Sequence, residues 1–394
     1  MKFSLDLRAA DPTYAYTIGS PSPDDIVIVD DLTVEMTVPA PNNEIVTLGL
    51  AAANENLYPA DFGGRTAEEY FLDPIGAGPF VLESNSDSGI TFVKNNLYWD
   101  AENITLDAVE LVIAPDPNAK LVGFESGDFD IITRQSTGVV DQLDAAGTAL
   151  VVDPSASVEA VFLNGAVAPF DDVNFRRAVW YGIDRTTIAD GVFDGLAKPA
   201  QGMIPSALSG ATPGANPPVY DPELAAEFLA ASAYADDASF DLVLIDGDGA
   251  RRDEAQVIAD QLDKIGITAN VTPLGYAEWA DLVLVTQGHQ ANLYGYETVV
   301  TPASDIIGFF ATTAGFFGGY DTTNAFGQFA ALQAAPDVAG QSAVIEEFET
   351  EFGEMAYAVP VVEPLWVLGV ADGVTGLVVP PTGFPDVAYV SLAG

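Results

Sequence analysis

The residues that could act as nucleophiles or metal ligands are few in this chain of 394 residues. The single histidine, His289, lies in a polar Gln-Gly-His-Gln loop, and there is no cysteine. A Ser-His-Asp triad would have to use His289, but no Gly-x-Ser-x-Gly elbow is present, because Glu125 stands at the centre of 123–127. One histidine without cysteine also argues against a tight zinc or nickel site. We therefore expect neither catalysis at His289 nor a metal or other cofactor.

Other candidate sites fail on spacing. The segment DGDGARRDE at 246–254 begins like a calcium loop, but Ala250 and Arg251 stand where such a loop needs an acid and a glycine. It predicts a turn before a helix. Gly76-x-Gly78 lacks the third glycine and the helix of a dinucleotide site. Carboxylate pairs for hydrolysis arise by chance among 58 acidic residues. We do not expect an enzyme, although an acid-paired hydrolase stays open as an alternative.

Arginine is concentrated in one short stretch. Arg176, Arg177 and Arg185 lie within ten positions, although the chain has only 13 lysines and arginines together. They belong to VFLNGAVAPFDDVNFRRAVWYGIDR at 161–185, which combines an extended apolar run, a Pro-Phe-Asp-Asp turn and an amphipathic helix. We expect these side chains to form structural ion pairs rather than ligand contacts. The expected partners are Asp171, Asp172 and Asp184.

The net charge of −45 excludes some partners. Nucleic acid is not expected, because no basic footprint for phosphate is present, and an anionic membrane surface is excluded for the same reason. Two explanations of the acidity stay open. One is adaptation to high salt, where self-repulsion is screened. The other is selection of a cationic ligand. Because the acids are scattered along the whole chain, the pattern favours salt adaptation.

The hydrophobic pattern predicts a mixed α/β protein of two or three domains. Residues 26–38 alternate around Asp30-Asp31 as a β-hairpin does. No uncharged apolar window of about 18 residues predicts a membrane span. Strands are expected at 80–83, 90–94, 106–113, 129–132, 240–245 and 267–271, and helices at 116–127, 173–183, 221–232 and 252–265.

The 161–185 stretch resembles a signature of the peptide-type extracellular solute-binding proteins of ABC importers, the oligopeptide, dipeptide and nickel group. Other segments resemble the same family in the same order. They are PIGAGPF at 74–80, NNLYW at 95–99, FESGDFD at 124–130, YDPELA at 220–225, the helix-to-strand passage at 252–267, and Glu278-Trp279.

The resemblance implies a type II periplasmic-binding-protein-like clam of two α/β lobes with an extra α+β domain, here lacking its N-terminal region. By analogy, residues 73–165 with 367–394 form lobe 1, residues 166–366 form lobe 2, and residues 1–72 form the remainder of the extra domain. The resemblance also implies that the two hinged lobes close around a peptide or other small organic solute and deliver it to a membrane permease. A monomer is expected, extracellular or periplasmic, tethered through an N-terminal anchor upstream of this sequence. A ligand-sensing receptor domain is the other alternative.

The resemblance also suggests where the ligand binds. In peptide-binding members an aspartate meets the ammonium group of the ligand, but Val299 falls near that position here, so peptide specificity stays open. Glu297 is a candidate substitute. Aromatic side chains around the expected inter-lobe strands could line an apolar cleft. The candidate ligand-binding residues are Tyr294, Tyr296, Glu297, Phe316, Phe317, Tyr320 and Trp366.

Overall fold

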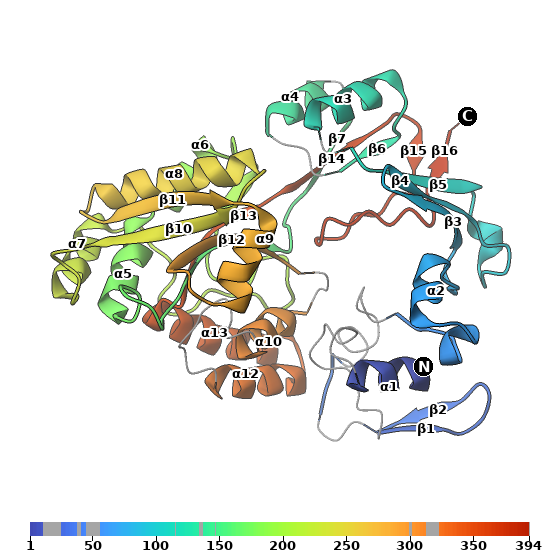
Figure 1. Ribbon diagram of the computed structural model, residues 1–394, viewed down its shortest axis with the longest axis horizontal. Helices are drawn as coiled ribbons and strands as arrows, with labels where there is room; N and C mark the ends of the chain where they lie inside the picture. The colour runs from blue at the N-terminus through green and yellow to red at the C-terminus, as the bar shows by residue number, and fades with distance from the viewer. Residues whose placement is uncertain are drawn as a thin grey trace. The chain divides into compact units, whose positions relative to one another are not determined.

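The structure, a computed structural model, describes residues 1–10, 25–37, 41–44, 56–114, 116–133, 137–145, 147–298, 302–312 and 323–393. The chain divides into two compact units. Unit 1 comprises 1–39, 45–152 and 366–394, and unit 2 comprises 40–44 and 153–365. Figure 1 labels their elements. In the described ranges, no helix is both long enough and apolar enough to cross a membrane.

Unit 1 contains small antiparallel sheets and short helices. Its main sheets have the orders β3-β4-β5 and β6-β14-β7, and the pairs β1-β2 and β15-β16 are separate. Its strands are β1 (Ile26–Ile28), β2 (Val34–Met36), β3 (Phe80–Ser86), β4 (Gly89–Lys94), β5 (Ala108–Val112), β6 (Ile131–Ile132), β7 (Ala149–Val152), β14 (Trp366–Val370), β15 (Val374–Thr375) and β16 (Ser391–Leu392). Its helices are α1 (Lys2–Ala10), η3 (Ala60–Gly63), α2 (Ala67–Leu72), η4 (Ala101–Asn103), α3 (Pro117–Ser126) and α4 (Thr137–Ala145).

Unit 2 is built on a six-stranded mixed sheet of order β11-β10-β12-β8-β13-β9. Its strands are β8 (Ser157–Leu163), β9 (Ala197–Pro199), β10 (Ser239–Ile245), β11 (Thr268–Leu274), β12 (Ala291–Glu297) and β13 (Ala358–Pro364). Its helices are α5 (Val173–Gly182), α6 (Arg185–Gly191), α7 (Pro222–Ala231), α8 (Gly249–Asp263), α9 (Tyr276–Ala280), η5 (Asp281–Val285), α10 (Ser304–Thr312), α12 (Thr323–Ala334) and α13 (Val338–Met355).

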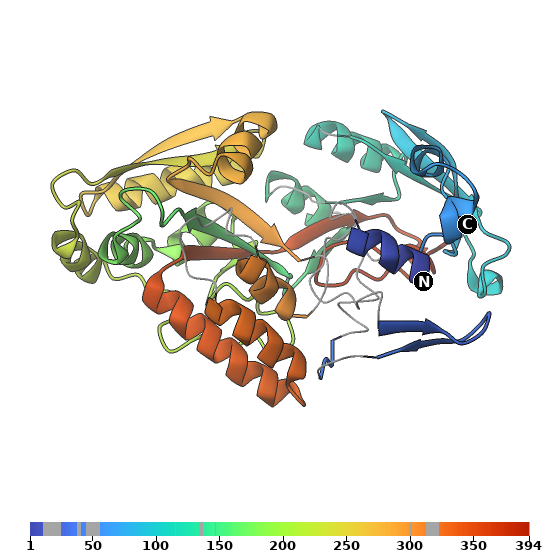
Figure 2. The same ribbon diagram turned by 60° about the horizontal axis from the view of Figure 1, so that its bottom comes forward.

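The core of unit 2 centres on β8, in which all seven residues are buried. A strand covered on both faces reads as a continuous apolar run, and SVEAVFL does so except at Ser157 and Glu159. Helix α12 packs against α10 and α13, and the three form one helical group, as Figure 2 shows. Elsewhere in unit 2, α7 packs against α5, and α8 packs against β10 and β11.

Several predicted boundaries are confirmed because local signals set them. The Asp116 carboxylate accepts a hydrogen bond from the Ala119 amide at 2.8 Å, and Gly127 ends helix α3 at φ 80°. Asp221 caps α7 in the same way. The predicted hairpin at 26–38 is present as the antiparallel pair β1-β2.

Helix α8 is predicted three residues too short at its start. It begins at Gly249 because Asp248 is its N-cap, accepting a hydrogen bond from the Arg251 amide at 3.3 Å. The 246–254 segment is therefore the turn and helix start that its sequence predicts.

Candidate ligand-binding edge of unit 2

The carboxyl ends of three strands lie at one edge of the unit 2 sheet. Strands β11 and β12 both run parallel to β10, so their last residues, Leu274, Glu297 and Ile245, share that edge. Strand β8 runs antiparallel to β12 and begins there, with Glu159 opposite Gly295. In open α/β sheets, ligands bind outside the carboxyl ends of the strands. This edge is therefore the candidate binding surface of unit 2.

An ion pair lies at this edge. Arg251 donates two hydrogen bonds to Glu159, from Nε to Oε2 at 3.0 Å and from Nη2 to Oε1 at 2.7 Å. Both side chains are largely buried, at 16% and 10% exposure. Burial acts to lower the pKa of Arg251, but the Glu159 carboxylate outweighs it and raises that pKa. The guanidinium is thus fixed in its charged form.

Gly295 makes this geometry possible. A Cβ at Gly295 would lie 2.4 Å from Glu159 Oε1 and 2.8 Å from Arg251 Nη2. Only a residue without a side chain leaves room for the pair between β8, β12 and the start of α8.

A second carboxyl group accompanies the pair. Glu254 is fully buried one turn along α8. Burial first, and then the Glu159 carboxylate, raise its pKa well above the ordinary value, while Arg251 opposes them. One cation therefore lies beside two buried carboxyl groups, of which Glu159 accepts its two hydrogen bonds.

Tyr294 contributes to packing at this edge. Its ring stacks on Trp279, with centroids 5.3 Å apart and planes at 16°, and it packs against the buried cluster of Val243, Trp279 and Val283. The Arg251 guanidinium lies 5.9 Å from the centroid of the Tyr294 ring. Tyr294 therefore links the predicted aromatic set to the ion pair.

Tyr296 is held by a half-buried acid, Asp305. Its hydroxyl donates to Asp305 Oδ2 at 3.1 Å, and its ring lies 4.6 Å from that of Phe309. Burial raises the pKa of Asp305 to about 6, although the bond from Tyr296 opposes the rise. Glu297, the next residue, is half-buried.

The other predicted site residues fall elsewhere. Trp366 opens β14 in unit 1, where a Cβ at Gly383 would approach its ring to within 2.6 Å. Phe316, Phe317, Tyr320 and Val299 lie outside the described residues. The structure thus places Tyr294, Tyr296 and Glu297 together on β12.

The sequence reasoning missed Glu159, Arg251, Glu254 and Asp305. Glu159 had a recognisable signal, because a carboxylate inside an otherwise apolar strand needs a buried partner. The partner, Arg251, is 92 residues away, and its contact depends on the sheet order.

The arginine signature has a structural role, but the predicted partners are wrong. Arg185 is 4% exposed and donates to three main-chain carbonyls, those of Pro360 at 2.6 Å, Ile183 at 2.9 Å and Trp180 at 3.3 Å. Burial lowers the pKa of Arg185 to about 9, so it stays charged at neutral pH. Its neighbours behave alike, since Arg176 donates to Met355 and Phe170 carbonyls, and Arg177 to that of Glu354.

The predicted carboxylate partners are used locally instead. Asp172 and Asp184 accept from amides at the starts of α5 and α6, and Asp171 accepts from the Tyr234 hydroxyl at 2.8 Å. Asn164, at the end of the signature strand, is fully buried and donates to the Gln287 and His289 carbonyls at 2.9 and 2.8 Å. The signature therefore joins β8 and α5 to the rest of unit 2.

Comparison with known proteins identifies the protein family. The model of the bacterial extracellular solute-binding proteins, family 5 Middle, matches residues 2–317. The chain belongs to this family, as its 161–185 stretch predicts.

Curated relatives support the assignment. Heme-binding protein A of Haemophilus influenzae is 26% identical over 265 residues, which cover 64% of this chain and 47% of that protein. Glutathione-binding protein GsiB of Salmonella paratyphi A is 27% identical over 256 residues, covering 63% and 48%. The match thus spans about half the length of these relatives.

Solved structures confirm the fold class. The periplasmic binding protein AgaA from A. tumefaciens R10, in complex with agropinic acid, has a TM-score of 0.82 at 20% identity, covering 100% of this chain and 83% of that chain. NikA from Brucella suis, in complex with Fe(III)-EDTA, has a TM-score of 0.82 at 18% identity, covering 100% and 84%. The predicted type II periplasmic-binding-protein fold is therefore confirmed.

Proposed function

We propose that this chain is the solute-binding component of an ABC importer, which captures a peptide or other small organic solute and delivers it to membrane permease subunits. The match of the solute-binding family over residues 2–317 carries the proposal. Relatives are named for binding glutathione, heme, and di- and tripeptides. Their names give no support to the hydrolase alternative.

We place the ligand contacts on the carboxyl edge of unit 2 and on β14. The proposed contacts on β12 are Tyr294, Tyr296 and Glu297, and the proposed contact on β14 is Trp366. Phe316, Phe317 and Tyr320 complete the proposed set. The half-buried Glu297, which follows Tyr296, suits an ammonium or other cationic group on the solute.

The division into lobes belongs to the same proposal. The predicted lobe 1 (residues 73–165 with 367–394) includes β8, and the predicted lobe 2 (residues 166–366) includes Trp366. Because β8 pairs with β12 and β13 in unit 2 and Trp366 belongs to unit 1, we move β8 to lobe 2 and Trp366 to lobe 1. Residues 1–72 belong to the extra domain in the same proposal. Members of this family are extracellular or periplasmic proteins. An N-terminal membrane tether, outside residues 1–394, is part of the proposal and is tested by fractionation of cells expressing the whole gene.

The test is a binding measurement in molar KCl. The probes are glutathione, the dipeptide Met-Leu, haem and agropinic acid, each measured by calorimetry and thermal shift. A solute at 100 times its Kd stabilises the folded state by about 2.7 kcal/mol. If none of these probes and no member of a wider peptide and amine library binds, the proposed function is wrong.

A variant pair tests the site. Glu297→Gln is expected to weaken binding of a cationic solute about tenfold or more, through loss of a charge-assisted hydrogen bond. Glu346→Gln changes an exposed carboxylate on α13 and is the matched control. If both variants bind the cationic solute with equal affinity, its cationic group does not bind at Glu297.

A further inference from the structure

A short segment, residues 41–44, contacts the helical group of α10, α12 and α13 (Figure 2). Residues 40–44 belong to unit 2, although the segments before and after them, 1–39 and 45–152, belong to unit 1. We call residues 41–44 the clip. Its last residue, Glu44, is only 5% exposed. A buried carboxylate needs hydrogen-bond partners, so the contacts of Glu44 show where the clip is fixed.

The Glu44 carboxylate lies at the starts of two helices. Its Oε2 accepts from the hydroxyl of Ser304, the fully buried first residue of α10. Its Oε1 accepts from Gln341 Nε2 at 3.3 Å, near the start of α13. Burial raises the pKa of Glu44, and the bond from Ser304 opposes the rise. Because the first amides of a helix have no partner within it, a negative charge is stabilised there.

Asn43 bonds to the end of the third helix, α12. Its main-chain amide donates to the Gln333 carbonyl at 2.8 Å, and its side-chain Nδ2 donates to the Ala335 carbonyl. Gln333 lies in the last turn of α12, where helix carbonyls have no partner within the helix. The clip therefore contacts all three helices, with donors at one carboxyl end and an acceptor at two amino ends.

The start of α10 also holds Tyr296. Asp305, the residue after Ser304, accepts from the Tyr296 hydroxyl at 3.1 Å. Phe309, one turn further along α10, lies 4.6 Å from Tyr296 between ring centroids. A shift of this helix start would therefore move both groups that orient Tyr296. The clip, the start of α10 and Tyr296 thus form one connected set of contacts within unit 2.

We propose that the clip fixes the start of α10 and thereby the hydroxyl and ring of Tyr296, so that Glu44 is a positioning residue for solute binding. This inference rests on the proposed function, in which Tyr296 contacts the solute. Glu44 acts through Ser304 and Asp305 and is not itself a solute contact. A contact residue that is already ordered raises affinity, because less ordering is needed on binding. Loss of the clip should therefore weaken solute binding.

Measurements without solute test the effect of the clip on α10. The variants are made in the protein that the whole gene encodes. Glu44→Ala should speed hydrogen exchange of the α10 amides at 307–311 by about tenfold or more, because the helix start loses its anchor. It should also shift the ring NMR signals of Tyr296. Unchanged Tyr296 signals in Glu44→Ala would overturn the proposal.

Glu351→Ala is the matched control. Glu351 also accepts two side-chain hydrogen bonds within the same helical group, from Asn324 Nδ2 at 3.1 Å and Gln328 Nε2 at 3.3 Å. Both donors belong to α12, and neither contacts Tyr296. Glu351→Ala should therefore leave the Tyr296 signals and the solute affinity unchanged. Equal shifts in the two variants would mean a general effect of the helical group and would overturn the proposal.

Affinity tests the link from the clip to the solute. The probes are glutathione, Met-Leu, haem and agropinic acid in molar KCl. For a probe that binds, Glu44→Ala should weaken affinity about tenfold. In a Tyr296→Phe background, which lacks the hydroxyl, the same change should weaken affinity less than about threefold, because residues that act through one contact are not additive. An equal loss in both backgrounds would overturn the positioning role.

Failure of the proposed function gives a different result. If no probe binds the unaltered protein, that function is wrong and the role of Glu44 in solute binding is wrong with it. Shifted Tyr296 signals in Glu44→Ala would still establish that the clip holds α10.

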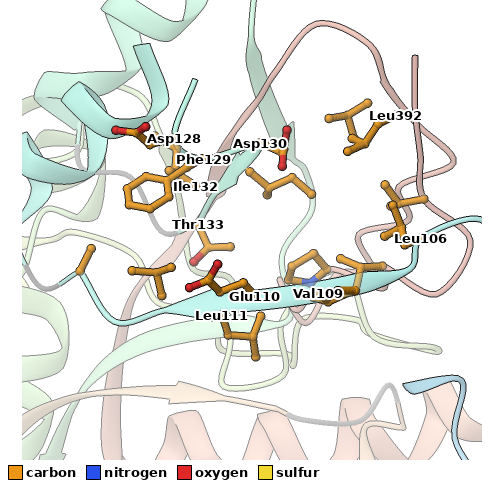
Figure 3. A pocket seen from close by; sticks show the side chains of 18 of the residues that line it. Leu106, Val109, Glu110, Leu111, Asp128, Phe129, Asp130, Ile132, Thr133 and Leu392 are labelled. Atoms are coloured by element: carbon orange, nitrogen blue, oxygen red, sulfur yellow. The ribbon is translucent and has the colours of Figure 1, made fainter. Parts of the chain in front are cut away.

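A solute bound in unit 1 would also be recognised. A cavity of about 610 Å³ lies there, with Val109, Phe129 and Ile132 among its lining residues (Figure 3). A solute in this cavity should shift the methyl NMR signals of Val109 and Ile132. If it does so and its affinity is unchanged in Glu44→Ala, the positioning role of Glu44 is overturned.

Discussion

Arg251 and Glu159 are joined by two hydrogen bonds across unit 2, from the start of α8 to the start of β8. Truncating one partner leaves the other charge buried. We expect Arg251→Ala to lower the free energy of unfolding by about 3 kcal/mol. Chemical denaturation measures the change. Arg252→Ala is the control, because that side chain is 54% exposed, and it should cost less than about 1 kcal/mol. Similar losses in the two variants would contradict the buried pair.

Gly295→Ala tests the space around the same pair. The new methyl group would meet Glu159 Oε1 at 2.4 Å, so the pair or the strand must shift. We expect a loss of about 1–3 kcal/mol. Gly249→Ala, with no atom within 4 Å of the added carbon, should be neutral or slightly stabilising. A neutral Gly295→Ala would show that the pair has room to move.

Arg185→Lys tests the arginine signature. An ammonium group cannot reproduce the planar arrangement of donors that satisfies the Pro360, Ile183 and Trp180 carbonyls. We expect a loss of about 3 kcal/mol, because buried acceptors lose their donors. Arg177 donates to one carbonyl and is half-buried, so Arg177→Lys should cost about 1 kcal/mol or less. Solute affinity should be unchanged in both folded variants.

Glu349 predicts a pH dependence of stability. Burial raises its pKa from 4.5 to about 8, although the Ile204 and Met203 amides oppose the rise. The pKa of Glu349 is higher in the folded state than in the unfolded state, so between pH 4.5 and about 8 the folded state binds more protons than the unfolded state. Its contribution is complete below pH 4.5 and is lost as pH rises toward 8, at up to about 1.4 kcal/mol per pH unit.

Glu349→Gln should make the fall in stability with pH shallower, while Glu254 and Asp305 keep their own contributions, and denaturation between pH 5 and about 8 measures the difference. Glu346→Gln, on the exposed face of the same helix, should keep the slope. An unchanged slope in Glu349→Gln would contradict the buried acid.

Salt should stabilise the protein. With a net charge of −45, self-repulsion opposes the compact state at low ionic strength, and about 1 M salt shortens the Debye length to about 3 Å. We expect Tm to rise steadily with KCl. Sucrose, which screens no charge, is the control for general solvent effects. A Tm independent of KCl would contradict salt adaptation.

The prediction of the fold succeeded where signals are local. Helix α3 begins after Asp116 and ends at Gly127, and α7 begins after Asp221 with Pro222 in its first turn. Each of these signals acts within one helical turn, so adjacent residues suffice to predict these helix ends. The contacts of the candidate site depend on signals that are not local. Tyr294, Tyr296 and Glu297 share β12 because they are neighbours in sequence, whereas Asp305 and Arg251 reach them through tertiary packing.

The sequence by itself determined the family, the types of the helices and strands, and the acidity. Motifs and helix caps are properties of short segments, and the net charge is a property of the overall composition. Only the tertiary structure decided what the charged side chains contact. Arg185 meets the carbonyl of Pro360, 175 residues away, and nearby carboxylates serve helix ends instead. Only sheet topology shows that, among the described residues, β5 pairs with β4 and β6 with β14, because pairing between strands is a non-local property.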